Sequence, residues 1–339
     1  MNADTLIKTA QAMVVPGKGV LAADESTGTI KKRFDSINVE SVEETRRAYR
    51  DMLFTTAGME DFVSGVILFE ETLFQKASDG TPFSKLLADK GVIPGIKVDK
   101  GAKDLAGAPG EKVTEGLDGL RERLIEYREA GARFAKWRAV ITIGDGIPTD
   151  YCIQANAHAL ARYAALCQEQ DIVPIVEPEV LMDADNTLEV CEDVTSRTLQ
   201  AVFAELDLQG VLLEGMLLKP NMVISGKKCP TQADVQTVAE ATVRTLKRYV
   251  PSAVPGIVFL SGGQSDELAT AHLDAMNKLG PLPWALSFSY GRALQAPALA
   301  AWSGKNENVA AGQRAFFHRA KCNSAAAKGE YSSAMEQAA

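Results

Sequence analysis

The segment GVLLEGMLLKPN, residues 210–221, is an apolar, strand-like run that ends on Lys219, followed at once by Pro220. Runs of the same kind recur along the chain between helical stretches: VLAAD (20–24), FVSGVILFE (62–70), VIPGIKVD (92–99), FAKWRAVI (134–141), IVPIVEPE (172–179), GIVFLSGG (256–263) and ALSFSYG (285–291). Near-continuous apolar strands that alternate with helices are typical of a parallel sheet covered on both faces. Eight such units predict an α/β fold of the closed (β/α)8 barrel type.

Helical spacing of apolar residues predicts helices over residues 114–130, 150–168, 186–206, 231–249 and 265–278. Further helical segments before the first strand and after the eighth are extra to the barrel. No Ser/Gly-rich linker divides the chain, so we expect one domain over residues 1–339, with a mobile tail from about residue 328 to 339. A doubly wound open sheet is the rival architecture, but VLAADESTG lacks the G-x-G-x-x-G pattern expected after its first strand.

The composition narrows the class of protein. The 339 residues are 46% hydrophobic and 24% charged, and the net charge of −8 argues against a nucleic-acid binder or an anionic-membrane binder. No apolar run has the length of a membrane-spanning helix, and the N-terminal residues lack the apolar core of a secretory signal. The five cysteines are scattered without C-x-x-C spacing, which indicates reduced thiols in a cytoplasmic protein.

Charged or hydrogen-bonding side chains stand at the carboxyl end of nearly every predicted strand. They are Asp24, Glu70, Lys97, Asp99, Lys136, Arg138, Glu177, Glu179, Lys219, Ser261 and Arg292. Active sites of (β/α)8 barrels lie at these ends, so the pattern predicts a functional site at this mouth.

Strand alternation sharpens this prediction for residues 134–141. Lys136 and Arg138 share one face of the strand, and Trp137 lies on the other. We expect the two cations to point into the barrel. The alternative, in which they point outward, is disfavoured because the outer face of such a strand packs under helices and tolerates charge poorly.

The loops after the seventh and eighth strands, LSGGQS (260–265) and SYGRA (289–293), are rich in hydrogen-bond donors. These loops form the usual phosphate site of the fold, and an arginine suits bidentate phosphate contact. Ser26 and Thr29 after the first strand offer two more hydroxyls, with Arg33 one turn beyond Thr29. Helix capping is an equally good explanation for these hydroxyls, and both roles are compatible.

A lysine at a buried strand end is costly to keep as a cation, and a neutral amine attacks carbonyl carbons. The residues alone leave Lys97, Lys136 and Lys219 as competing Schiff-base nucleophiles, while a lysine that extends into solvent is the commoner case. The three histidines are far apart in the sequence and form no H-x-x-x-H pattern, which argues against zinc chemistry. Carboxylate-bound magnesium remains open.

The chain resembles the class I fructose-1,6-bisphosphate aldolases along nearly its whole length. The matching motifs occur in family order: LAADESTGTIKKR, GIKVDKG, FAKWR, IVPIVEPE, LLKPNMV, FLSGGQS and WALSFSYGRALQ. The resemblance implies reversible cleavage of fructose 1,6-bisphosphate to dihydroxyacetone phosphate and glyceraldehyde 3-phosphate, in glycolysis and gluconeogenesis. It also implies a cytoplasmic homotetramer that uses no metal and no cofactor.

The resemblance assigns roles to individual residues. Lys219 forms the Schiff base, Glu177 is the general acid and base of carbinolamine formation and dehydration, and Asp24 takes the hydroxyl proton during carbon–carbon cleavage. Lys136 lies beside Lys219, helps to keep it neutral and stabilises developing oxyanions. One phosphate is held by Ser261, Gly262, Gly263, Ser289 and Arg292, and the other lies toward Ser26, Thr29 and Lys97, with Arg33 and Arg138 as further contacts. Glu179 and Gly291 complete the expected substrate-binding set.

This sequence departs from the family pattern at two places. Thr29 stands where the family commonly has serine, which keeps the hydroxyl. Many members end in a tyrosine that assists proton exchange on the enamine, whereas this sequence ends in MEQAA and its Tyr331 aligns with an internal position. We expect Tyr331→Phe to change turnover little.

Two other functions compete with this interpretation. One is a Schiff-base aldolase for a related ketose phosphate on the same barrel, and the other is a scaffold or binding protein without catalytic activity. The intact set Asp24, Lys136, Glu177 and Lys219 argues against a scaffold alone, because a scaffold has no need of it.

Overall fold

The computed structural model describes residues 1–338 and contains a closed barrel of eight parallel strands, which confirms the predicted fold class. Around the barrel, the neighbours run in the order β1-β10-β9-β8-β7-β6-β3-β2. The barrel strands are β1 (Gly19–Ala23), β2 (Val63–Leu68), β3 (Ile93–Lys97), β6 (Phe134–Ile141), β7 (Val173–Val180), β8 (Leu217–Leu218), β9 (Gly256–Phe259) and β10 (Ala285–Tyr290). Each strand is buried along most or all of its length, because helices cover its outer face and side chains fill the interior.

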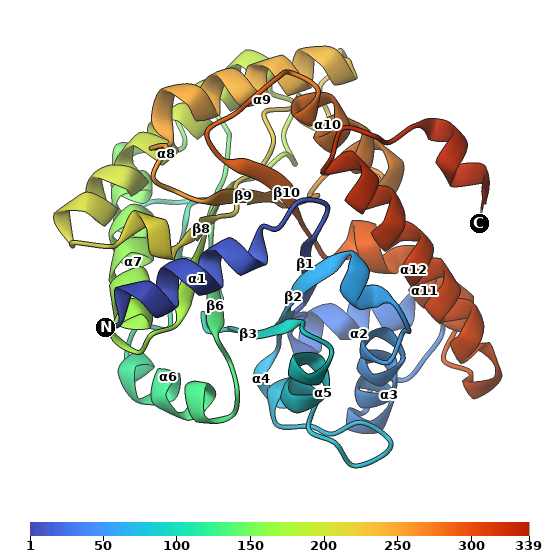
Figure 1. Ribbon diagram of the computed structural model, residues 1–339. Helices are drawn as coiled ribbons and strands as arrows, with labels where there is room; N and C mark the ends of the chain where they lie inside the picture. The colour runs from blue at the N-terminus through green and yellow to red at the C-terminus, as the bar shows by residue number, and fades with distance from the viewer. Residues whose placement is uncertain (339) are drawn as a thin grey trace.

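Helices surround the barrel, as Figure 1 shows. They are α1 (Ala3–Met13), α2 (Thr27–Asp35), α3 (Glu43–Phe54), α4 (Glu70–Leu73), α5 (Phe83–Asp89), α6 (Leu120–Glu129), α7 (Asp150–Glu169), α8 (Leu188–Leu208), α9 (Val235–Tyr249), α10 (Asp266–Asn277), α11 (Arg292–Trp302) and α12 (Val309–Ala326). Short 3₁₀ helices are η1 (Met59–Asp61), η2 (Leu213–Gly215), η3 (Asn306–Asn308) and η4 (Ser333–Ala338). The expected extra helices are present, since α1 precedes β1 and α12 follows the last α/β unit.

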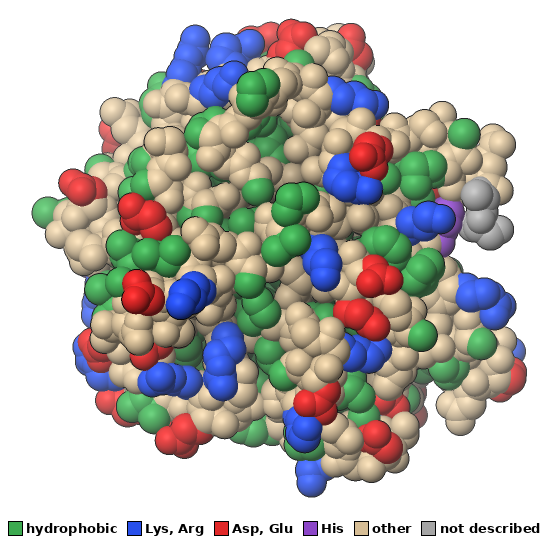
Figure 2. Space-filling view, in the orientation of Figure 1, with side chains coloured by type: hydrophobic (Ala, Val, Ile, Leu, Met, Phe, Trp, Pro, Cys, Tyr) green, Lys and Arg blue, Asp and Glu red, His purple; other side chains and the backbone are tan. Residues whose placement is uncertain are grey.

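The amino end of the barrel is closed by α1. This helix crosses in front of the strands in Figure 1 and packs its buried residues Leu6, Ala10 and Met13 onto the apolar side chains inside the barrel. Phe134 fills the centre of this half, and a Cβ atom on Gly95 would lie only 2.3 Å from its ring. The surface at this end carries cations and anions interspersed among apolar and neutral side chains (Figure 2). This end of the barrel is therefore a packed floor beneath the opposite mouth.

The strand predicted over residues 210–219 is wrong in its first part. Only Leu217–Leu218 are in the ladder, and Leu213–Gly215 form the 3₁₀ turn η2. Gln168 of α7 satisfies the backbone here in place of a strand partner: its amide accepts from the Leu212 N–H at 2.9 Å and donates to the Leu212 carbonyl at 2.8 Å. An apolar run alone does not distinguish a strand from such a turn.

The helix predicted over residues 114–130 begins later than expected, at Leu120. Gly116 and Gly119 have φ values of +129° and +66°, which are incompatible with a continuous right-handed helix. Residues before them form a hairpin that the sequence analysis missed, with β4 (Ala102–Asp104) paired antiparallel to β5 (Lys112–Thr114). All three residues of β4 are exposed, so the strand has no need of the alternating apolar pattern that marks a half-buried strand in a sequence.

The C-terminal segment contacts the barrel's outer helices. Tyr331 is buried, its N–H donates to Asp274 Oδ1 at 2.9 Å, and its hydroxyl donates to Glu336 Oε1 at 2.8 Å. The mobility of residues 328–339 and the single-domain organisation stay predictions. Among residues 1–338, none of the helices combines the length and the apolar character needed to cross a bilayer.

Candidate active site

A cavity of about 280 Å³ opens at the carboxyl ends of the barrel strands. Its lining residues are Ala22, Asp24, Glu25, Ser26, Thr29, Arg33, Lys97, Lys136, Arg138, Glu177, Glu179, Lys219, Leu260, Ser261, Gly262, Ser289, Gly291 and Arg292. The cavity thus brings together all but one of the catalytic and substrate-binding residues that the family resemblance implies. The exception is Gly263, which follows Gly262 and faces Met182.

Lys136 lies at the centre of a buried charge cluster. Its Nζ atom is 2.7 Å from Asp24 Oδ2, 3.3 Å from Glu177 Oε2 and 4.0 Å from Asp99 Oδ2. The Lys136 side chain is only 4% exposed, so these carboxylates replace its water shell. β6 places it there because alternate residues of the strand point inward, while Trp137 points outward and stacks on Tyr163 of α7. The predicted inward orientation of Lys136 is what the structure contains.

Lys219 lies on the other side of Glu177. Its Nζ atom is 3.3 Å from Glu177 Oε1, and its side chain is 5% exposed. The Lys219 N–H donates to the Val176 carbonyl at 2.8 Å, which continues the β7–β8 pairing past the end of β8. Pro220 has no N–H, yet its carbonyl accepts from the Leu260 N–H at 3.2 Å, so the backbone remains fixed on both sides of the lysine.

The two amines therefore share one carboxylate. Glu177 Oε2 is buried and makes no hydrogen bond within the described residues, because the orientation of the nearby Lys136 amine does not meet hydrogen-bond geometry. A buried carboxylate oxygen without a partner is costly and is usually satisfied by water or a ligand. Glu177 consequently has an acceptor position available between the two lysines.

The charge cluster sets the protonation state of its members. Burial alone would raise the pKa of Asp24, but its electrostatic interactions with Lys136 above all, and then with Lys219 and Lys97, hold it well below its usual range. Burial alone would lower the pKa of Lys136, but Asp24, Glu177 and Asp99 raise it well above its usual value. At neutral pH, Asp24 is an anion that can accept a proton and Lys136 is a fixed cation.

The β9 and β10 ends supply hydrogen-bond donors on one side of the cavity. Ser289 has a buried hydroxyl with no partner in the described part of the chain. The Arg292 guanidinium donates to the Gln264 carbonyl and lies 3.6 Å from Asp266 Oδ1 at the start of α10. These contacts hold the arginine at the rim, while the unpaired Ser289 hydroxyl marks a position where a ligand oxygen can bind.

The α2 side carries the hydroxyls of Ser26 and Thr29, which lie 3.2 Å apart. Ser26 is the residue before the first turn of α2, but its side chain makes no capping hydrogen bond. The capping explanation for Ser26 is therefore wrong, and its hydroxyl is available to the cavity. Arg33 lies near the β10 end, since a Cβ atom on Gly291 would be 3.5 Å from its guanidinium.

Lys97 and Arg138 complete the cationic lining from β3 and β6. The Lys97 amine is 2.7 Å from Asp99 Oδ1 and also donates to the Asp99 carbonyl at 2.9 Å. Arg138 is paired with Glu179 through its Nε atom, and this pairing raises the pKa of Arg138 further although burial opposes the shift. Both cations are thus held in place by one carboxylate residue each.

The family model described as "Glycolytic: Fructose-bisphosphate aldolase class-I" matches residues 5–339 of this chain. The chain belongs to the class-I fructose-bisphosphate aldolase family. It is 61% identical over 332 residues to the probable fructose-bisphosphate aldolase class 1 of Xanthomonas campestris pv. campestris, covering 98% of this chain and 99% of that protein. It is 60% identical over 330 residues to "Fructose-bisphosphate aldolase 5, cytosolic" of Arabidopsis thaliana, covering 97% and 92%.

The same family relationship holds in three dimensions. A solved structure of fructose-bisphosphate aldolase from Plasmodium falciparum, in complex with TRAP and a small-molecule inhibitor, superposes with a TM-score of 0.96. The two chains are 55% identical, and the match covers 98% of this chain and 97% of that one.

This aldolase family member has a site residue that the sequence analysis missed, Glu25. Its carboxylate pairs with Arg33, lies 3.1 Å from Arg50 and accepts from the Gln295 amide at 2.8 Å. Glu25 thereby fixes Arg33 against the cavity. The only sequence signal was its position next to Asp24. Its partners Arg50 and Gln295 come from α3 and α11, which the sequence does not place beside it.

Glu70 was expected at the mouth but lies outside the cavity lining, because it begins α4. The Tyr127 hydroxyl donates to Glu70 Oε1 at 2.7 Å, and Lys100 is 3.3 Å from Glu70 Oε2. These contacts and its half-exposed position make Glu70 part of the outer loop structure.

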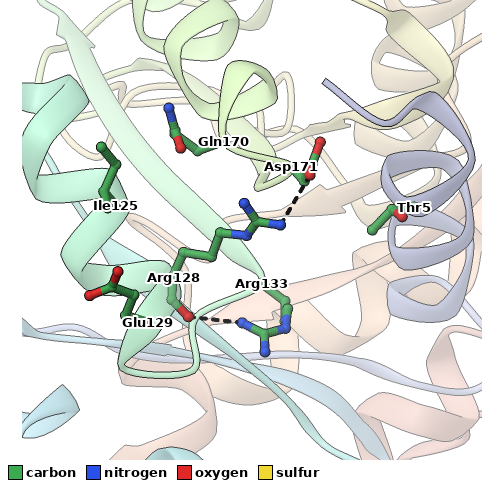
Figure 3. Close-up of a pocket in the computed structure, with 7 residues that line it drawn as sticks. All are labelled: Thr5, Ile125, Arg128, Glu129, Arg133, Gln170 and Asp171. Atoms are coloured by element: carbon green, nitrogen blue, oxygen red, sulfur yellow. Dashed lines mark hydrogen bonds and ion pairs between the residues drawn. The ribbon is translucent and has the colours of Figure 1, made fainter.

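A larger cavity, of about 460 Å³, lies near the amino ends of β6 and β7 (Figure 3). Its two arginines are occupied: Arg128 pairs with Asp171 at 3.1 Å, and Arg133 donates to the Arg128 carbonyl at 3.1 Å. No lysine or buried acid–base pair is among its lining residues. The cavity at the carboxyl ends, in contrast, is lined by Lys136 and Lys219 in contact with the Glu177 carboxylate.

Proposed function

We propose that this protein catalyses the reversible cleavage of fructose 1,6-bisphosphate to dihydroxyacetone phosphate and glyceraldehyde 3-phosphate through a Schiff base on Lys219. Family membership supports the reaction. The observation that carries the assignment is the buried series Lys219–Glu177–Lys136–Asp24, in which each neighbouring pair is within 3.3 Å. Amine, acid–base group, fixed cation and carboxylate base are the components that a Schiff-base aldol cleavage requires.

The first stage joins Lys219 to the substrate ketone. Glu177 takes a proton from the Lys219 amine, and the neutral amine attacks the carbonyl carbon. Glu177 passes its proton to the carbonyl oxygen, and the amine then gives a second proton to Glu177, which leaves a carbinolamine and a protonated Glu177. Glu177 then assists the loss of that oxygen as water, leaving an iminium. The 3.3 Å contact of Glu177 with Lys219 and the unpaired Oε2 atom of Glu177 support this role. The nearby Lys136 cation stabilises the negative charge that develops on the substrate oxygen.

The second stage breaks the carbon–carbon bond. The Asp24 carboxylate takes the proton of the hydroxyl on the carbon beyond the scissile bond, that carbon becomes the aldehyde, and the bonding electrons move into the iminium to give an enamine. Glyceraldehyde 3-phosphate leaves, the enamine carbon is protonated, and water hydrolyses the restored iminium. The depressed pKa of Asp24 supports a base that is unprotonated at neutral pH.

The cationic rim supports a substrate with a phosphate at each end. Ser261, Gly262, Gly263, Ser289, Gly291 and Arg292 supply donors for one phosphate, and Ser26, Thr29, Lys97, Arg33, Arg138 and Glu179 form the remaining substrate contacts. Arg33, on the α2 side, lies beside Gly291 of the first set, and this position supports a contact of Arg33 with either phosphate. The iminium supplies the electron sink, so class I cleavage needs no metal or cofactor.

A direct assay separates this proposal from its nearest alternative. Aldehyde release is measured with fructose 1,6-bisphosphate, tagatose 1,6-bisphosphate and fructose 1-phosphate, each with and without EDTA. We expect the highest kcat/KM for fructose 1,6-bisphosphate and no effect of EDTA. Higher kcat/KM for another ketose phosphate would assign the enzyme to that substrate, and loss of all activity in EDTA would contradict the metal-independent mechanism.

We also propose that the protein acts in the cytoplasm as a homotetramer in glycolysis and gluconeogenesis. The cytosolic designation of the Arabidopsis relative supports the location. Light scattering on the purified chain tests the assembly: a tetramer has four times the 36.3 kDa mass of one chain, and a species at the monomer mass would contradict it.

A further inference from the structure

A thiol, an imidazole and a carboxylate meet outside the catalytic cavity, at the contact between α12 and η4. His318 and Cys322 lie one turn apart on α12, and Glu336 comes from η4. The helix and the segment after it lie at the edge of the barrel in Figure 1. The His318 Nε2 atom is 3.6 Å from Cys322 Sγ and 3.8 Å from Glu336 Oε2, and all three atoms lie within 4.8 Å of one another.

These separations fit the edges of a metal tetrahedron. Zinc bonds of about 2.3 Å to sulfur and about 2.0–2.1 Å to nitrogen or oxygen, at tetrahedral angles, place the ligand atoms roughly 3.3–3.6 Å apart. The observed distances from His318 exceed this range by a few tenths of an ångström or less. The third separation, between the Cys322 sulfur and the Glu336 carboxylate, is no more than 4.8 Å. One ion between the three side chains therefore requires the thiol and the carboxylate to move toward each other, while the two distances from His318 already fit.

We propose that His318, Cys322 and Glu336 bind one divalent cation of the zinc class, with water as the fourth ligand. Thiolate and imidazole ligands select Zn²⁺ or a similar transition-metal ion, whereas Mg²⁺ and Ca²⁺ prefer oxygen ligands throughout. The spacing H-x₃-C places both α12 ligands on one face of the helix. The sequence analysis missed the site because its third ligand is fourteen residues away, in a separate element.

The Glu336 carboxylate is already held by two residues that would not themselves bind the ion. Arg319 contacts Glu336 Oε2, and the Tyr331 hydroxyl donates to Glu336 Oε1 at 2.8 Å. Oε2 keeps a second lone pair that can face the ion. Such outer hydrogen bonds orient metal ligands and strengthen binding, so Arg319 and Tyr331 are positioning residues of this site.

Binding displaces the thiol proton of Cys322 to solvent. Burial, followed by the negative charge of Glu336, raises the pKa of this thiol to about 11, although Arg319 and Lys321 oppose the shift. A metal ion must therefore compete with the proton. His318 and Glu336 are 17% and 14% exposed, which leaves the ion a route from solvent.

The consequence of binding is structural. The ion would join η4 to α12 independently of the cleavage chemistry, because none of the three ligands lines the catalytic cavity. Bound metal and EDTA-resistant cleavage are thus compatible in one protein.

The test is a Co²⁺ titration of the full, metal-stripped protein, followed by displacement with Zn²⁺. We expect one equivalent of Co²⁺ to give the visible bands of a four-coordinate ion together with a near-ultraviolet thiolate charge-transfer band, and one equivalent of Zn²⁺ to abolish both. Cys322→Ser should abolish the charge-transfer band. Cys229→Ser, which removes another buried thiol, is the matched control and should retain it.

Two further variants keep the test decisive if Cys322→Ser unfolds. His318→Gln removes a partly exposed ligand and should weaken Zn²⁺ binding by more than about 100-fold, and Tyr331→Phe removes only an outer hydrogen bond and should weaken it by about 10-fold. The proposal is overturned if wild-type protein shows no charge-transfer band, if the band survives Cys322→Ser, or if His318→Gln binds Zn²⁺ as tightly as wild type.

Discussion

The two halves of the barrel interior are built on the same strands and have opposite character. Towards the amino end, β6, β7 and β8 point Phe134, Ile175 and Leu217 inward, and these belong to one apolar cluster. Two residues further along the chain from each of these lie Lys136, Glu177 and Lys219, which form the charged group of the mouth. Two residues span roughly 6.6 Å of strand, so the change from dry floor to charged mouth occurs within that distance.

This difference shows how the fold supports reactive buried charges. The floor is closed by α1, and Phe134 and the other side chains of this cluster are buried, so the lysines stand above a dry apolar layer. The charges above it are stabilised by one another, and each lysine contacts at least one carboxylate. Changes in the floor should therefore alter stability, whereas changes in the mouth should alter chemistry.

The largest expected effect is the loss of cleavage activity on Lys219→Ala, a change in the mouth of the barrel. We expect kcat for cleavage to fall by at least about 10⁴-fold, because removal of a covalent nucleophile costs losses of this scale. Glu177 keeps Lys136 as its ion partner in this variant, so the melting temperature should change little. Steady-state kinetics and circular dichroism measure the two quantities. Substantial residual turnover in folded protein would assign the chemistry to another residue.

In the floor, Phe134→Ala should destabilise the protein by about 3–5 kcal/mol, because it leaves a cavity in a fully buried cluster. Gly95→Ala should cost about 1–3 kcal/mol through overpacking, since its new Cβ atom would lie 2.3 Å from the Phe134 ring. The double variant should lose less stability than the sum. Urea unfolding checks this, with Gly28→Ala, whose Cβ atom meets nothing within 4 Å, as the control. Additive losses would contradict the described contact.

A smaller effect concerns the pH dependence of stability and involves α10, the helix that follows the loop of residues 260–265. His272 of α10 contacts Gln264 at 2.6 Å, and burial lowers the pKa of His272 to about 4. Below its usual pKa of about 6.5, His272 binds a proton in the unfolded chain but not in the folded protein. The free energy of unfolding therefore decreases as the pH is lowered from about 6.5 toward 4. We expect wild type to lose about 2 kcal/mol more than His272→Gln between pH 7 and 5. Parallel slopes would show that His272 titrates normally.

The smallest expected effect is that of Tyr331→Phe on cleavage. Tyr331 contacts Glu336 and Asp274 on the outer helices and does not line the catalytic cavity, so turnover should change by less than roughly threefold. A hundredfold loss of kcat would place this hydroxyl in the proton transfers of the mouth.

The sequence predicts the barrel well where alternation and burial agree. Residues 134–141 form β6 over the predicted range because charged and aromatic side chains separate cleanly onto two faces. The apolar segment 210–219 is predicted too long because its turn depends on Gln168, which is distant in the sequence. Local pattern carries no information about such a partner.

The same limit applies to the site. The strand-end charges locate the mouth, and family resemblance selects Lys219 among three lysines. Glu25 remains indistinguishable from its neighbour Asp24 until the positions of Arg33 and Arg50 are known. The cluster of His318, Cys322 and Glu336 likewise depends on how the C-terminal segment folds back onto α12.

The most direct test of the central claim is borohydride reduction of the enzyme in the presence of dihydroxyacetone phosphate, followed by peptide mass mapping. Reduction converts the iminium into a stable secondary amine and leaves the substrate carbons on the reacting lysine. We predict that the added mass lies on Lys219 alone. Label on Lys97 or Lys136 instead, or no label in active protein, would contradict the mechanism.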